Sequence, residues 1–170
     1  AGVKFDVTML FGGQIRGQPM RLFMIYGAGN FIECGMDAPF LQIGEHKYGK
    51  PILDRAAHYD TPLYDAIKLV LVSMDSTLRS NLSVGLPLDM LVYKTGALEI
   101  THFSHIDATN AYFDQIHNTW GEKLKEVFSA LPNPVWTETS AEEARLVSLR
   151  VGTSAETRPT HSIQTLAGQQ

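Results

Sequence analysis

The fold is decided by the stretch Thr61-Pro-Leu-Tyr-Asp-Ala-Ile-Lys-Leu-Val-Leu-Val-Ser-Met-Asp-Ser-Thr-Leu-Arg79. Thr61 is a suitable N-cap and Pro62 suits the first position of a helix. Apolar residues recur at the spacing of one helical face, and three more widen that face, so we expect a largely covered helix. These residues are Leu63, Ala66, Ile67, Val70, Met74 and Leu78, widened by Leu69, Leu71 and Val72. Asp75, near the helix end, is poorly placed for the helix dipole, which indicates a tertiary partner or a solvated side chain.

Strands are predicted before this helix. Residues 3–11 alternate between apolar and polar side chains, and Gly12 and Gly13 close that strand. Residues 21–26 are a second, buried strand, which turns at residues 27–30 into residues 31–34. This pattern is typical of a β-hairpin.

Residues 40–44 read as a further strand and residues 48–57 as a helix, in which Pro51 is tolerable only within the first turn. After the long helix, residues 88–93 and 97–101 read as a second hairpin around Thr95-Gly96.

A last helix is predicted, capped by Asp107 or Thr109 and ending before Pro132. One of its sides is apolar and must pack on something: Phe113, Ile116, Trp120, Leu124, Val127, Phe128 and Leu131.

Strands and helices in separate runs favour an α+β layered sandwich, with antiparallel strands and flanking helices. Residues 1–136 form its folded part. Residues 137–170 contain few large apolar side chains, so we expect a flexible tail there.

Composition excludes several function classes. The chain has 170 residues, 44% of them hydrophobic, and a net charge of -4 without a basic face, which disfavours nucleic acid as a partner. Its apolar runs are too short to span a bilayer, and its start has no secretory leader. The single cysteine, Cys34, excludes an internal disulfide and favours the cytoplasm.

Two long stretches, residues 40–55 and 73–93, resemble the second half of Anbu, the bacterial relative of proteasome β-subunits. Shorter stretches extend the resemblance over most of residues 5 to 136: Gly12-Gly13-Gln14, residues 21–26, residues 29–33, Trp120-Gly-Glu and residues 131–136.

The resemblance implies an αββα sandwich of the N-terminal-nucleophile hydrolases, with a threonine nucleophile at the mature N-terminus. It also implies subunits assembled into homo-oligomeric rings or open spirals that cut peptides or unfolded proteins, without cofactor or metal. In this family the nucleophile and its tuning aspartate and lysine precede the segment with which this chain starts. Ala1, Lys4 and Asp6 do not replace them, so no catalytic residue is expected in this chain.

By the resemblance, this chain contributes only residues that surround and support the nucleophile. It places Glu45 where proteasome subunits have a serine, and Ser83, with Asp75 or Asn81, where they have an aspartate-serine pair.

Other interpretations of single motifs are less favoured. Gly27-Ala28-Gly29 suits a hairpin turn better than a dinucleotide fingerprint. His102 and His105 suit a strand end better than a metal site, and Cys34 suits a small buried residue better than a nucleophile. Glu45-His46-Lys47 is either a helix-start neutraliser or a charged edge of the substrate cleft.

Three functions follow in order of preference. The first is a truncated threonine peptidase subunit, inactive alone. The second is a natural non-catalytic half-domain for assembly or scaffolding, since the strand at 21–26 and the helix at 62–79 call for cover on both sides. The third is an unrelated small α+β binding domain.

Overall fold

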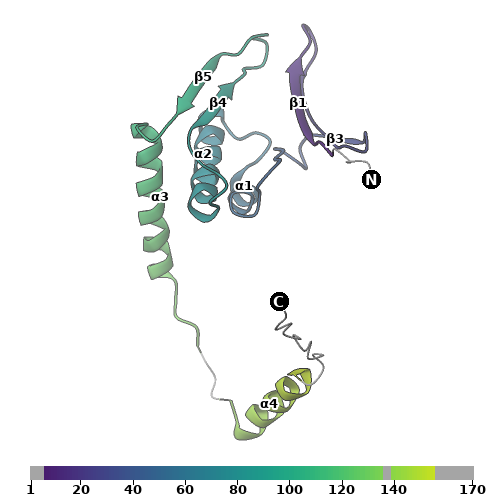
Figure 1. The fold of residues 1–170 in the computed structure, drawn as a ribbon. Coiled ribbons are helices and arrows are strands. Elements are labelled where there is room, and N and C mark those ends of the chain that lie inside the picture. Colours follow the sequence, from purple (N-terminus) through teal and green to yellow (C-terminus); the bar gives the residue numbers. More distant parts are fainter. Residues whose placement is uncertain (1–5, 136–138, 156–170) are drawn as a thin grey trace, which may run out of the picture. The chain divides into compact units, whose positions relative to one another are not determined.

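The computed structural model describes residues 6–135 and 139–155 and divides the chain into two compact units, split after Ala130. The first unit holds two antiparallel sheets and three helices (Figure 1). The predicted α+β class is confirmed.

The first sheet has the strand order β1 (Met9–Gln14), β2 (Met20–Ile25), β3 (Phe31–Glu33). The turn between β2 and β3 is the predicted hairpin, with Gly29 at φ 87°. Gly12 and Gly13 do not close β1 as predicted, because Gly12 pairs with Leu22 inside the sheet. A Cβ on Gly12 would lie 3.0 Å from Leu22 Cδ1, so the glycine makes room for that side chain.

The predicted strand at residues 40–44 is wrong: this segment is irregular and pairs with no strand in the described chain. It leads into α1 (Lys50–Ala56), which has Pro51 in its first turn as expected. Gly49 precedes this helix and is buried against α2.

The long helix α2 (Leu63–Ser80) is confirmed, but Thr61 does not cap it. Thr61 Oγ1 instead accepts a hydrogen bond from the His58 backbone N–H at 2.8 Å, and Pro62 occupies the N-cap position. Only the second half of α2 is well covered, because Leu63 and Val70 remain 39% and 48% exposed.

The second sheet joins β4 (Leu88–Val92) to β5 (His102–Ile106). The predicted position of β5, residues 97–101, is therefore wrong, since these residues belong to the connection. The next helix, α3 (Ala111–Ala130), is capped by Asn110, whose Oδ1 accepts the Phe113 backbone N–H at 2.9 Å. Asp107 and Thr109 are hydrogen-bonded to each other instead.

The core lies where α2, β5 and α3 meet, at Leu71, Ile106 and Phe113. On the other face of the second sheet, the cross-strand pair Leu91 and Phe103 stays 61% and 58% exposed. The apolar side of α3 is fully buried only at Phe113, and Ile116 and Trp120 are half-buried. Leu124, Val127 and Phe128, in the last part of the helix, are exposed (Figure 1).

The second unit contains α4 (Ala141–Ala155), a helix that the sequence analysis did not identify. Ser140 and Glu143 form a reciprocal capping box: Glu143 Oε2 accepts the Ser140 N–H at 3.0 Å, and Ser140 Oγ accepts the Glu143 N–H at 3.3 Å. Residues 137, 138 and 156–170 of the predicted tail lie outside the described residues, and its flexibility stays a prediction. None of the described helices has the length and apolar character required to cross a membrane.

Candidate functional site

Three of the four residues predicted to support a site lie together. Asn81, at the end of α2, donates from Nδ2 to Glu45 Oε2 at 2.7 Å. Ser83, two residues later, donates from both its backbone N–H and its hydroxyl to Asn81 Oδ1, at 2.8 and 2.7 Å. Glu45, Asn81 and Ser83, hereafter the Glu45 cluster, therefore join the segment before α1 to the segment after α2.

The position of Glu45 is set by the irregular segment that carries it. Gly44 turns the chain at φ 78°, and Glu45 Oε1 accepts the backbone N–H of Lys47 at 2.9 Å. Gln42 Nε2 donates to the Glu45 carbonyl at 3.0 Å, while Gln42 Oε1 is buried with no hydrogen-bond partner among the described residues. Glu45 does not neutralise the start of α1, which has Gly49 as its N-cap.

The charge of Glu45 is favoured by its neighbours. The backbone N–H of Lys47 first, and the Lys47 charge and the Asn81 amide after it, outweigh desolvation and hold the pKa of Glu45 below its ordinary 4.5. Because the folded pKa is lowered, these contacts stabilise the fold above pH 4.5 and are lost as pH falls through the folded pKa. Glu45 is therefore ionised at neutral pH.

The structure places Asp75 away from the Glu45 cluster. Its side chain is 7% exposed on α2 and contacts His117 Nδ1 of α3 at 2.5 Å. This is the tertiary partner that an acidic residue on the covered part of α2 required. The predicted site role of Asp75 stays a prediction.

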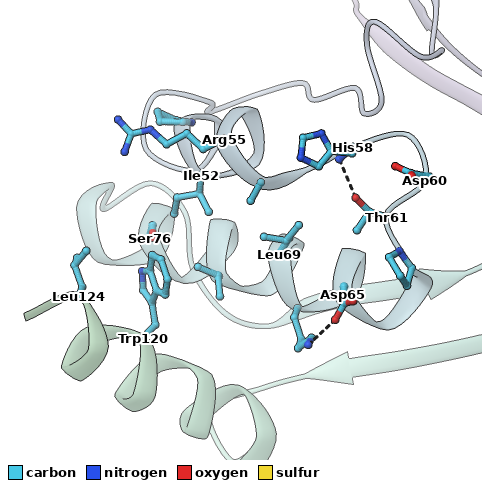
Figure 2. A pocket seen from close by; sticks show the side chains of 15 residues that line it. Ile52, Arg55, His58, Asp60, Thr61, Asp65, Leu69, Ser76, Trp120 and Leu124 are labelled. Carbon is cyan, nitrogen blue, oxygen red and sulfur yellow. Dashed lines mark hydrogen bonds and ion pairs between the residues drawn. The ribbon is translucent and has the colours of Figure 1, made fainter. Parts of the chain in front are cut away.

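A groove of about 910 Å³ lies elsewhere, between α1, α2 and α3. Figure 2 shows Ile52, Leu69 and Trp120 converging on it from the three helices. Apolar side chains such as Ile52, Leu69 and Trp120 line it beside polar ones such as His58 and Asp65. The Glu45 cluster, where hydrogen-bonding groups converge, is the better candidate site. The groove is better suited to protein contact.

The less favoured motifs have structural partners. His105 Nδ1 lies 2.7 Å from Asp89 Oδ1 across the second sheet. Among the described residues, no group of three or more His, Cys, Asp or Glu side chains is suited to hold a metal ion. Cys34 Sγ donates to the Ala38 carbonyl, and burial raises the pKa of this thiol, which keeps it protonated and a poor nucleophile.

Two polar contacts were missed by the sequence analysis. Gln14 Oε1 accepts the Gly96 backbone N–H at 2.6 Å and so links the first sheet to the loop between β4 and β5. His117 was missed because periodicity marks only the apolar positions of α3. The one sequence feature that pointed to this contact was Asp75, an acidic residue on the covered side of α2 that needs a partner.

No protein-family model and no curated protein matches the chain. Solved structures do match. Anbu from Hyphomicrobium sp. strain MC1 is 50% identical over 78% of this chain and 57% of its own, with a TM-score of 0.75. Anbu from Yersinia bercovieri, described as an ancestral β-subunit, is 51% identical over 76% and 54%, with a TM-score of 0.73.

The helical assembly of the Anbu complex from Pseudomonas aeruginosa is 51% identical over 73% of this chain and 52% of its own, with a TM-score of 0.70. The chain thus spans little more than half the length of the solved subunits that it matches. With half of its residues identical over about three quarters of its length, and with the same fold, this chain belongs to the Anbu family of proteasome-like proteins.

Proposed function

We propose that this chain is part of a threonine-type peptidase subunit that hydrolyses peptides or unfolded proteins inside a self-compartmentalised homo-oligomer in the cytoplasm. Its nucleophile is supplied by residues outside this sequence. The observation that carries the proposal is the Glu45 cluster, which joins residues from two distant segments at positions where the resemblance expects the supporting wall of the site.

In this proposal the chain supplies supporting residues and neither the nucleophile nor its base. A threonine hydroxyl is a weak nucleophile and needs a base, which in this class is the free α-amino group of the same residue. The Glu45 cluster contains no base of that kind. Its hydrogen-bonding groups orient and support the reacting residue.

The test uses the complete subunit, with the sequence that precedes this chain in its gene. An open frame with a methionine-threonine start about one hundred residues upstream is expected by analogy with the family. Hydrolysis of fluorogenic peptides by that subunit, lost when the threonine is replaced by alanine, would support the proposal. A stop codon immediately upstream, or an active threonine variant, would reject it.

A non-catalytic half-domain for assembly is the alternative, and the bare apolar residues favour an associating surface. Leu91 and Phe103 on the second sheet and Phe128 on α3, 74% exposed, have no cover among the described residues. A natural half-domain should be monodisperse and protease-resistant when purified. Aggregation or dye binding typical of a molten state would instead indicate that the missing part completes the fold.

The groove between α1, α2 and α3 is proposed to contact a second copy, as the solved helical assembly of a relative suggests. Leu124→Asp puts a charge on this apolar lining, and we expect the complete subunit to lose its assembled form in light scattering. Gln115→Glu, which adds the same charge on the opposite side of α3, is the matched control and should leave assembly intact. Assembly that is unchanged in Leu124→Asp would contradict this contact.

A further inference from the structure

A pocket of about 610 Å³ lies at one end of the second sheet, where β4 and β5 meet the first turns of α2 and α3. A cavity of this size suits a small molecule. Met90 and Val92 line it from β4, because alternate residues of a strand point to the same side, and Ile67 lines it from α2. Met90 and Ile67 also pack against the core. The pocket therefore has an apolar wall that is continuous with the core.

Polar groups line the same pocket. Lys94 follows β4 and His102 begins β5, and neither side chain makes a hydrogen bond or ion pair with another described residue. Lys68 also lines the pocket, but its ammonium group is already paired with Asp65 at 2.6 Å. None of the described lining residues is acidic. The Lys94 ammonium therefore lacks a counter-charge within the pocket.

These groups determine which ligand fits. One unpaired ammonium matches a single negative charge, whereas a phosphate group carries about 1.5 to 2 negative charges at neutral pH. A carboxylate has two oxygens that accept hydrogen bonds, and both an ammonium and an imidazole ring have N–H groups to donate. We propose that this pocket binds a small monocarboxylate with an apolar body. Its carboxylate accepts from Lys94 and His102, and its hydrocarbon part packs on the apolar wall.

The pocket is remote from the Glu45 cluster. It is lined by the first two turns of α2, whereas Asn81 follows the last residue of that helix. At a rise of about 1.5 Å per residue, roughly 20 Å separates Lys68 from Asn81. A ligand in this pocket does not occupy the candidate peptidase site, so the inference goes beyond the proposed function and does not depend on it.

A series of ligands with one chain length and different head groups tests the charge preference. NMR titration of the complete subunit compares octanoate with octanol, octyltrimethylammonium and monooctyl phosphate. We expect octanoate to bind about threefold or more tightly than each of the other three, the scale of one partly exposed charge contact. Octanol or the phosphate binding as tightly as octanoate overturns the inference.

A charge substitution assigns the head group to its partner. Lys94→Gln should weaken octanoate binding about threefold or more and leave octanol binding unchanged. Lys125→Gln is the matched control, because it removes the same charge from an exposed position of α3 outside the pocket. It should change neither affinity. Octanoate binding that is unaltered in Lys94→Gln contradicts the proposed contact.

An aromatic substitution tests the apolar part. Tyr64 lines the mouth of the pocket and is 76% exposed, so its removal should not disturb the fold. Tyr64→Ala should weaken octanoate and octanol binding alike, since it removes apolar contact and no charge. Tyr59→Ala, at a similarly exposed residue outside this pocket, should weaken neither. Equal effects of the two changes would place the ligand elsewhere.

Methionine methyl signals locate the ligand without any activity measurement. Octanoate should shift the Met90 signal of the complete subunit and leave that of Met36, which does not line the pocket, in place. The shift should persist when the nucleophilic threonine is replaced by alanine. A subunit that hydrolyses nothing but shows this shift rejects the proposed function and supports the present inference. An active subunit whose Met90 signal ignores octanoate overturns the inference alone.

Discussion

Replacing Gly49 with alanine is expected to lower the free energy of unfolding by about 1–3 kcal/mol, the usual effect of overfilling a packed contact. An added Cβ would lie 2.8 Å from both Ser73 O and Thr77 Oγ1 of α2, and closer still to Ser73 Oγ. The backbone carbonyl cannot rotate away, so α1 must move. Urea denaturation of the complete subunit, followed by circular dichroism, measures the loss.

Gly121→Ala is the matched control, with the opposite expected sign. Gly121 lies inside α3, and a Cβ there would meet no atom within 4 Å. Alanine should therefore stabilise the chain by up to about 1 kcal/mol through helix propensity. A Gly49→Ala chain as stable as the wild type would show that α1 does not approach α2 as closely as described.

His117→Ala is expected to destabilise the chain by about 1–3 kcal/mol, because it leaves the buried Asp75 carboxylate without this partner. Asp75→Ala should destabilise as well. The double variant should lose less than the sum of the two, since each single change removes the same contact. Chemical denaturation of the wild-type complete subunit and of its three variants yields the coupling energy.

A second histidine-aspartate pair serves as the control. His105 and Asp89 are joined at 2.7 Å, but their side chains are 55% and 62% exposed, so His105→Ala should change stability little. Equal losses in His117→Ala and His105→Ala would mean that burial of Asp75 does not matter.

Much of the fold could be predicted because local patterns determined it. Pro51 fixed the first turn of α1, and the hairpin between β2 and β3 is specified by the glycines of its turn. The strand predicted at residues 40–44 failed because a strand needs a neighbour with which to pair, and a short, mostly apolar stretch does not provide one. The position of β5 was predicted wrongly for the same reason, because the residues that pair with Leu88–Val92 are His102–Ile106. The polar residues of His102–Ile106 weakened the strand pattern there.

The candidate site was less accessible to sequence reasoning. Glu45 and Asn81 lie 36 residues apart, and no spacing rule joins a loop carboxylate to the end of a helix. The family resemblance identified both positions, whereas the hydrogen bonds between them required coordinates. The sequence indicated that Asp75 could have a tertiary partner, but it did not identify that partner as His117.

Gln14 links the two sheets of the first unit. Gln14 lies on the edge strand β1, and its Oε1 accepts hydrogen bonds from the Gly96 backbone N–H and the Tyr93 hydroxyl. This one side chain therefore connects the three-stranded sheet to the β4–β5 loop. Amide protons of β1 to β3 should consequently exchange with deuterium in one cooperative group, and those of α2 in another that opens more rarely.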